Sequence, residues 1–248
     1  MARRSQRRFV RVVDRIGAES TTDAVAAIVA GLVTVNGLIV TNPEALIASD
    51  AVVAVTPERV LRGTGKLRAA FRGFPAVVSG RVCLDVGAAA GGFTAALLEA
   101  DAKRVNAVDV GYGQLVGWLR QDARVVNLER TNLADLSEGL IPEPVEVICL
   151  DLSYLALSDA IPQLTWLDLA DDAQLLALVK PTFELHAPSM ITDGQAVDRA
   201  VAAPKVAAGS NGWSMDRRIV PVQGRGGAPE MFIYGTYRPN YAPRAMTQ

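Results

Sequence analysis

The sequence predicts an α/β protein built on a doubly wound, mostly parallel sheet, with a small α+β module before it. From residue 82 onward, short β-rich runs alternate with stretches of helical periodicity, which is typical of a sheet covered by helices. Before residue 58, short helical and β-rich pieces follow one another without that alternation. At 248 residues, half of them hydrophobic, the chain is long enough for both parts.

The N-terminal part, residues 1–57, is predicted to form a compact ααβββ module. Phe9 to Ile16 and Val25 to Leu32 each place apolar residues on one helical face. Leu32 to Val40 holds two β-rich pieces around an Asn-Gly step, which is a strong hairpin signal. Ala51 to Thr56 is a further strand. The module therefore combines helices with a small sheet.

Residues 58–80 are predicted to be a basic connector between the two parts. Between residues 59 and 73 the chain carries cations and no acid. Gly63-Thr64-Gly65 indicates a loop, and a helix can begin at Lys66. The plainest interpretation is a solvated linker. The sheet domain is then expected over 81–240, and a disordered tail over 241–248.

Seven strands are expected in the sheet domain. They are predicted at 82–86, 105–109, 125–128, 145–150, 174–179, 217–222 and 230–236. Only a short turn-rich stretch separates the last two, so they are expected to pair as an antiparallel hairpin at the end of the sheet.

A turn of Gly and Ala follows the first of these strands and leads into a helix that begins at Phe93. Such a turn presents backbone N–H groups and a helix N-terminus to a nucleotide-like ligand. Its glycine spacing matches neither the dinucleotide nor the P-loop motif. Asp85, two residues before the first Gly, favours a positively charged ligand such as S-adenosylmethionine. An ordinary strand-to-helix turn is the alternative.

Polar residues follow the next strands at the edge where ligands bind in such sheets. Asp109 lies about 20 residues past the start of the glycine turn, where an acid can bind both hydroxyls of a ribose. The piece Glu129 to Asn132 can border an adenine ring. Asp151 and Lys180 end the fourth and fifth strands. Solvated loop charges are the alternative for each residue taken alone.

Two further cation and carboxylate candidates reach the same edge. Glu230 begins the last strand, and an antiparallel strand begins where its parallel neighbours end. Lys66 in the connector is able to reach this edge as well. Convergence of so many charged residues at one edge favours a site over isolated surface charges.

Bulk properties limit the function classes. A net charge of −1 and a pI of 5.9 argue against uniform coating of nucleic acid. Cys83 and Cys149 lie in apolar runs and are interpreted as buried thiols, so neither a disulfide nor a metal is expected. The absence of an 18-residue apolar stretch or a signal peptide predicts a cytoplasmic protein without a membrane partner. The three tryptophans are interpreted as packing residues, and no aromatic stacking platform is expected; they are Trp118, Trp166 and Trp213.

Six stretches together resemble the haemolysin A type ribosomal RNA methyltransferases, which are FtsJ-like 2′-O-methyltransferases with an N-terminal S4 RNA-binding domain. These stretches are Val82 to Thr94, Val108 to Leu115, Leu128 to Asn132, Leu150 to Tyr154, Val179 to Glu184 and Gly212-Trp213. The resemblance implies a Rossmann-like class I methyltransferase sheet of seven strands with the last one antiparallel. It also implies an S4-like domain over residues 1–57. The expected activity is methyl transfer from S-adenosyl-L-methionine to a ribose 2′-hydroxyl, with ribosomal RNA or ribosomal subunits as partners.

The family's catalytic tetrad falls by motif on Lys66, Asp151, Lys180 and Glu230. A ribose hydroxyl must be deprotonated as it attacks, so Lys180 is assigned as the base, oriented by Asp151 and Glu230, while Lys66 positions the hydroxyl or stabilises developing negative charge. The residues expected at the cofactor are Asp85, Gly87, Ala88, Gly91, Gly92, Phe93, Asp109, Asn132 and Asp151. The cations expected to contact RNA are Arg3, Arg4, Arg7, Arg8, Arg59, Arg62 and Arg68.

One departure from the family keeps other functions open. S4 domains normally have a basic second helix, whereas Asp23 to Ala30 holds no cation. RNA docking would then depend on the N-terminal arginines and on residues 59–72. One alternative is a catalytically idle protein that keeps the cofactor pocket. A haemolysin-like, membrane-active protein is a further alternative, which no amphipathic basic helix supports.

Overall fold

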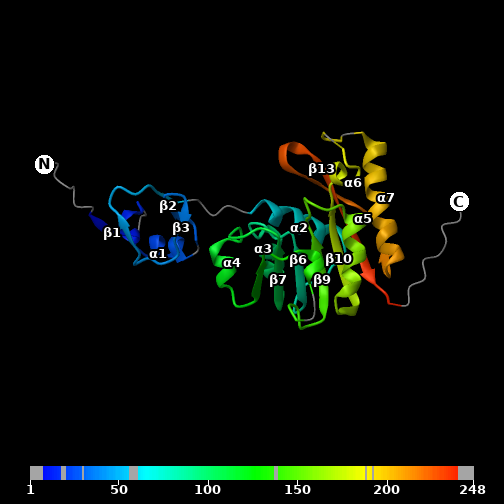
Figure 1. The fold of residues 1–248 in the computed structure, drawn as a ribbon, viewed down its shortest axis with the longest axis horizontal. Helices are drawn as coiled ribbons and strands as arrows, with labels where there is room; N and C mark the ends of the chain where they lie inside the picture. Colours follow the sequence, from blue (N-terminus) through cyan, green and yellow to red (C-terminus); the bar gives the residue numbers. More distant parts are fainter. Residues whose placement is uncertain are drawn as a thin grey trace. The chain divides into compact units, whose positions relative to one another are not determined.

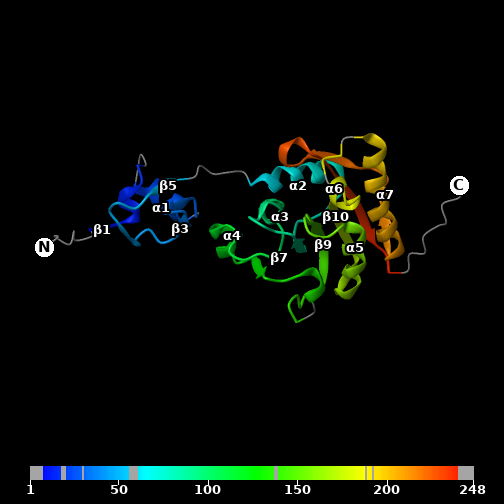
Figure 2. The ribbon, with the colours of Figure 1, turned by 45° about the horizontal axis from the view of Figure 1, so that its top comes forward.

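The computed structural model describes residues 8–17, 21–29, 31–55, 61–136, 139–187, 189–191 and 193–239. The chain contains two compact units, a smaller one that holds residues 1–60 and 116–122 and a larger one that holds residues 61–115 and 123–248 with the main sheet. Figures 1 and 2 show the elements of both units. The predicted boundary near residue 57 falls among residues 56–60, and the predicted tail over 241–248 also lies outside the described residues.

The smaller unit is built from short strands and two short helical segments. Its elements are β1 (Phe9–Arg11), the 3₁₀ turn η1 (Val12–Arg15), α1 (Thr21–Val29), β2 (Val33–Val35), β3 (Leu38–Ile39), β4 (Leu46–Ala48) and β5 (Val53–Val55). β1 pairs with β4, and β2 pairs with both β3 and β5, all antiparallel. Seven buried side chains form the core of this unit: Val12, Val13, Ala24, Ile28, Val33, Ile47 and Ala51.

Two sequence predictions for this unit had opposite outcomes. The hairpin around Asn36-Gly37 is confirmed, and both residues have positive φ (50° and 83°), as a type I′ turn requires. The helix predicted from Phe9 to Ile16 is wrong. The chain instead forms β1 and one 3₁₀ turn, because β-branched residues such as Val10 suit a strand and β4 supplies its hydrogen-bond partners.

The larger unit alternates strands and helices as predicted. Before and between the central strands the chain has α2 (Arg62–Gly73), β6 (Val82–Val86), α3 (Gly92–Glu99), β7 (Arg104–Asp109), α4 (Gly117–Gln121), β8 (Val125–Glu129), η2 (Leu133–Asp135) and β9 (Val145–Leu150). Of these elements, α4 lies in the segment 116–122 that is grouped with the smaller unit. It continues with α5 (Leu157–Ala160), η3 (Ile161–Trp166), β10 (Leu169–Val179), α6 (Pro181–Glu184), α7 (Gly194–Ser210), β11 (Trp213–Met215), β12 (Val220–Gln223), η4 (Arg225–Gly227) and β13 (Pro229–Tyr237).

The main sheet has the strand order β11-β13-β10-β9-β6-β7-β8, with β12 paired to β13 outside this path. The strands from β10 to β8 are parallel, whereas β13 runs antiparallel to β10. The predicted doubly wound sheet with an antiparallel last strand is therefore confirmed. β12 and β13 form the predicted antiparallel hairpin, but the short strand β11, which was not predicted, ends the sheet instead.

Alternation along β13 shows how helices cover both faces of the sheet. Ile233 belongs to the core formed with α5, η3 and α7. Phe232 and Tyr234 point to the other face, where they meet rings carried by α3 and by the end of α2. The Phe93 and Phe232 centroids are 5.7 Å apart, and those of Phe74 and Tyr234 are 5.3 Å apart.

The predicted basic connector contains α2, which is part of the larger unit. Its first turn packs directly on α3, because a Cβ built on Gly92 would lie only 2.7 Å from Gly63 Cα. Thr64 Oγ1 donates to the Gly92 carbonyl at 2.9 Å, and Leu67 is fully buried. The loop predicted at Gly63-Thr64-Gly65 is therefore wrong. Gly63 allows a close helix contact, and the segment is not a solvated linker.

Candidate active site

Four charged residues from four distant parts of the larger unit meet at the carboxyl edge of the parallel strands. Asp151 directly follows β9, and Lys180 directly follows β10. Glu230 is the second residue of β13. Because Val179 is paired with Met231 across β10 and β13, Lys180 and Glu230 occupy neighbouring strand positions. Lys66 reaches this edge from α2.

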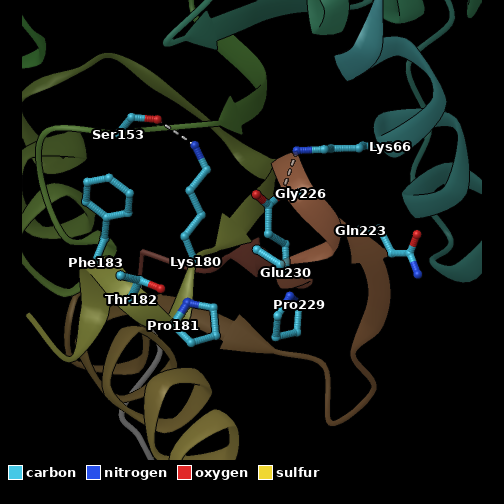
Figure 3. Close-up of a pocket in the computed structure, with 12 residues that line it drawn as sticks. Lys66, Ser153, Lys180, Pro181, Thr182, Phe183, Gln223, Gly226, Pro229 and Glu230 are labelled. Carbon is cyan, nitrogen blue, oxygen red and sulfur yellow. Dashed lines mark hydrogen bonds and ion pairs between the residues drawn. The ribbon is translucent and has the colours of Figure 1, made fainter. Parts of the chain in front are cut away.

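These residues form two ion pairs. Lys66 Nζ lies 2.5 Å from Glu230 Oε2, and the two side chains are only 17% and 9% exposed. Lys180 Nζ lies 2.6 Å from Asp151 Oδ1 and donates a hydrogen bond of 2.7 Å to Ser153 Oγ. Figure 3 shows Lys66 directed at Glu230 and Lys180 directed at Ser153. Glu230 thus pairs with Lys66, whereas the sequence interpretation gave it to Lys180.

Local sequence explains how two of these side chains are placed. Lys180 precedes Pro181, and a residue before proline is held in extended backbone, as its φ of −114° and ψ of 102° show. Pro181 then begins α6, which directs the chain away from the sheet edge. On the other side, a Cβ built on Gly224 would overlap Glu230 Oε1, so a glycine leaves room for the carboxylate.

A cavity of about 650 Å³ lies over the two ion pairs. Lys180 to Phe183 forms one wall, and the turn between β12 and β13 forms another. The Phe183 side chain contributes to the lining and is 41% exposed, so an aromatic surface faces this cavity. The sequence analysis expected no such surface. Its interpretation of the tryptophans holds for the fully buried Trp213 but not for Trp166, which is 62% exposed.

Asp85 lies beneath the glycine turn and is fully buried. Its Oδ2 accepts a hydrogen bond of 2.6 Å from Thr94 Oγ1, whereas its Oδ1 has no hydrogen-bond partner among the described residues. Burial raises the pKa of Asp85 to about 7. The site therefore holds a buried carboxylate with a free acceptor oxygen.

The turn itself folds back on the neighbouring strands. Gly87 has a φ of +88°, and a Cβ on it would overlap the Asp151 carbonyl oxygen. The amides of Gly87 and Ala88 both donate to the Val108 carbonyl, and that of Gly91 donates to Ala88. The expected free N–H groups are thus largely used within the protein, because the turn is held by β7.

The other residues expected at a cofactor differ in how far their side chains are already engaged within the protein. Asp109 accepts hydrogen bonds from the amides of Ala89 (2.8 Å) and Gly111 (2.7 Å), which orients its carboxylate beside the turn. The Asn132 side chain caps η2 by accepting from Ala134 N at 3.4 Å. Phe93 is buried, and its ring packs against Phe232, so its side chain serves the core of the unit.

Few of the predicted RNA-contacting arginines have described side chains. Arg8 is exposed. Arg68 is held by Glu99 through two hydrogen bonds of 2.8 Å, so its charge is paired within the protein. Arg3, Arg4, Arg7 and Arg59 lie outside the described residues, as does the side chain of Arg62.

Sequence reasoning missed two residues that support the site. Ser153 lies two positions after Asp151, and only its contact with Lys180 marks it. Glu184 is buried, and its carboxylate caps the start of α5, accepting from Leu157 N at 2.5 Å and from Ser158 Oγ at 3.2 Å. This cap ties the segment after Lys180 to the segment after Asp151. The signal available in the sequence was an acid four residues after Lys180.

Several features bear on other functions. Cys83 and Cys149 are buried free thiols, and burial raises the pKa of Cys83 to about 12. Among the described residues, no group of His, Cys, Asp or Glu side chains is arranged to hold a metal ion. Within the same part of the chain, no helix combines the length and apolar character needed to cross a membrane.

The strand order, the glycine turn and the charged edge define a Rossmann-like methyltransferase domain. Residues 59–235 match the model of the FtsJ-like methyltransferase family, so the chain belongs to this family and is a methyltransferase. The match includes α2, in agreement with its packing on α3.

Similar proteins cover most of the chain. The 16S/23S rRNA (cytidine-2′-O)-methyltransferase TlyA of Mycobacterium tuberculosis is 37% identical over 244 residues, 94% of this chain and 90% of the relative. Hemolysin A of Brachyspira hyodysenteriae is 37% identical over 67% of this chain and 70% of its own. A solved structure named "Putative hemolysin from Streptococcus thermophilus" has a TM-score of 0.67 and 29% identity, covering 93% of this chain and 89% of its own.

Proposed function

We propose that this protein transfers a methyl group from S-adenosyl-L-methionine to the 2′-hydroxyl of a ribose in ribosomal RNA. The observation that carries the proposal is the presence of two ion pairs, Lys66 with Glu230 and Lys180 with Asp151, at the carboxyl edge of the parallel strands, where Lys66, Lys180 and Glu230 line one cavity. The activity for which the Mycobacterium tuberculosis relative is named supports the same reaction and suggests cytidine as the target.

The turn between β6 and α3 fits S-adenosyl-L-methionine better than a phosphate-bearing nucleotide. The free oxygen of Asp85 suits the ammonium group of this cofactor, whereas a pyrophosphate would be repelled. Asp109 has only two of its acceptor positions occupied, so it is able to bind ribose hydroxyls as well. When bound, the cofactor supplies a methyl group on a positively charged sulfur.

The chain's own residues supply the proton chemistry. Lys180 in its neutral form takes the proton of the ribose hydroxyl at Nζ as the oxygen attacks. Asp151 stabilises the resulting ammonium, which lies 2.6 Å from its Oδ1. Lys66, held by Glu230, faces the cavity and stabilises negative charge on the attacking oxygen.

The remaining sequence predictions complete the proposal. Residues 1–57 form an S4-like domain that helps to dock RNA, and Arg8 is one of its exposed arginines. Phe183 offers an apolar face to the target nucleotide at the cavity wall. The enzyme acts on ribosomal RNA or ribosomal subunits in the cytoplasm.

A methyl-transfer assay with labelled S-adenosyl-L-methionine and ribosomal subunits tests the proposal. The unaltered protein is expected to label the RNA at a ribose 2′ position, located by blocked reverse transcription at low nucleotide concentration. Lys180→Ala should lower turnover by at least about 100-fold, which is the usual contribution of a positioned base. Lys103→Ala is the matched control, because this exposed lysine pairs with Glu143 far from the site.

Other outcomes separate the alternatives. Cofactor binding without transfer to any ribosomal substrate would identify an idle binding protein. Leakage from liposomes without transfer would identify a membrane-active protein. A filter-binding titration tests docking, since a flat dependence of log K on log salt would remove the role of phosphate contacts.

A further inference from the structure

The Lys180 side chain has two partners of different character. Its Nζ lies 2.6 Å from Asp151 Oδ1, but that buried oxygen has no hydrogen-bond partner among the described residues. The hydrogen bond goes to Ser153 Oγ, at 2.7 Å. Electrostatic attraction therefore comes from Asp151, while the direction of the Nζ group is set by Ser153 (Figure 3).

We infer that Ser153 is a positioning residue that holds the Nζ of Lys180 toward the cavity, and this inference rests on the proposed function. Both side chains line the cavity. The hydrogen bond between them therefore keeps the Lys180 Nζ at the cavity wall, next to Ser153. Without it, the ammonium is free to rotate toward Asp151 Oδ1 and complete the missing hydrogen bond there. The reacting nitrogen would then no longer point toward the position of the substrate hydroxyl.

The chemistry of a hydroxyl suits this role. A carboxylate only accepts hydrogen bonds, whereas a serine hydroxyl both donates and accepts. Ser153 is thus able to accept from the Lys180 ammonium and to donate to the neutral amine. It holds the same nitrogen before and after that nitrogen takes a proton.

The neighbouring residues support a positioning role for Ser153. The second lysine of the site, Lys66, is occupied by Glu230. The segment that carries Ser153 is fixed at both ends, by the Asp151 amide bonded to Val86 O and by the Glu184 cap on Leu157 N. The main chain on both sides of Ser153 is therefore tied to the sheet and to α6 without help from Lys180.

The test compares Ser153→Ala, Ser153→Thr and a control, Ser79→Ala, which removes a hydroxyl bonded to Asp101 on the surface. One readout uses the protein without cofactor. With ¹⁵N-labelled lysine at low temperature, a hydrogen-bonded ammonium gives a resolved resonance, assigned by its loss in Lys180→Met. We expect this resonance in the unaltered protein, in Ser153→Thr and in Ser79→Ala, and its broadening or displacement in Ser153→Ala.

The second readout is steady-state methyl transfer. Misplacing a reacting group by about 1 Å can cost up to about 100-fold, so Ser153→Ala should lower kcat by about 10- to 100-fold. The KM for RNA and the Kd for S-adenosyl-L-methionine should change by less than about threefold, and Ser153→Thr should recover most of kcat. An unchanged Lys180 resonance in Ser153→Ala, or failure of the threonine to restore kcat, would overturn the inference. If the unaltered protein transfers no methyl group, the proposed function fails, and the resonance still decides whether Ser153 orients Lys180.

Discussion

Lys66 and Glu230 are 164 positions apart in the chain, and their side chains form an ion pair of 2.5 Å with little exposure to solvent. One comes from α2, in the segment that the sequence presents as a linker, and the other from the last strand of the sheet. The pair joins the two ends of the catalytic unit. It also means that neither charge can be removed without leaving the other poorly solvated.

Removing Lys66 alone should therefore destabilise the protein. Lys66→Met leaves the buried Glu230 carboxylate without its cation, which should cost about 2 to 3 kcal/mol. The double variant Lys66→Met/Glu230→Gln should recover much of this loss, because no net charge remains. Urea unfolding of the single and double variants measures the coupling, and strictly additive losses would contradict it.

Gly224→Ala should remove activity while leaving the fold intact. The new Cβ would overlap Glu230 Oε1, which lies at the end of a flexible side chain, so the carboxylate must move and the protein need not unfold. We expect a fall in kcat of at least about tenfold. Gly209→Ala in α7, where a Cβ meets open space, is the matched control. Equal kcat for the two variants would show that the position of the Glu230 carboxylate is unimportant.

Two glycines in neighbouring helices should respond to alanine in opposite directions. Gly92→Ala places a Cβ 2.7 Å from the Gly63 backbone, which cannot move aside cheaply, so we expect a loss of about 2 kcal/mol or more. Gly65→Ala meets open space within α2 and should gain about 0.5 to 1 kcal/mol from helix propensity. Thermal unfolding of both variants checks the signs, and destabilisation by Gly65→Ala would contradict the helical assignment of this stretch.

Asp85 should make stability depend on pH in a defined window. Its folded pKa, raised by burial to about 7, exceeds an unfolded value of about 3.9. The folded state thus holds the proton longer, so the contribution of Asp85 is present below pH 4 and is lost as pH rises to 7. The stability of Asp85→Asn relative to the unaltered protein should increase by up to about 1.4 kcal/mol per pH unit between these limits. A difference that stays constant with pH would refute this.

Glu184 should stabilise the contact between the segment after Lys180 and the segment after Asp151. Glu184→Ala removes the cap from α5 and exposes the Leu157 amide to an apolar surrounding, which should cost about 1 to 3 kcal/mol. Because α5 and α6 are no longer tied, proteolysis of the cofactor-free protein should begin earlier at these segments. Ser158→Ala, which removes only the weaker 3.2 Å contact, should lose less than half as much.

The strands and their edge could be predicted because their signals are local. Continuous apolar runs such as Val147 to Leu150 suit strands that are covered on both faces, and the charged residue at each strand end follows directly from the chain order. The parallel topology then places Asp151 and Lys180 together without any knowledge of side-chain positions.

The predictions that were wrong concern properties that depend on how the elements pack against one another. Gly63 and Gly65 have low helix propensity, so a helix there was not expected; the contact with Gly92 overrides that propensity. Which carboxylate pairs with which lysine depends on side-chain reach across the edge, so the partner of Glu230 was assigned incorrectly. Ser153 carries no charge and belongs to no periodic pattern in the sequence. Its role can therefore be inferred only from its position in the fold.

The contact between Gly87 and the carbonyl of Asp151 has a consequence for how this enzyme family can diversify. The glycine turn after β6 and the main chain of Asp151 at the end of β9 approach each other closely. Their spacing is therefore independent of the side chains that surround the cavity. Substitutions in the walls, at Phe183 or in the turn before Pro229, are free to alter which nucleotide is accepted. The distance between donor and acceptor stays constant while the choice of RNA target changes.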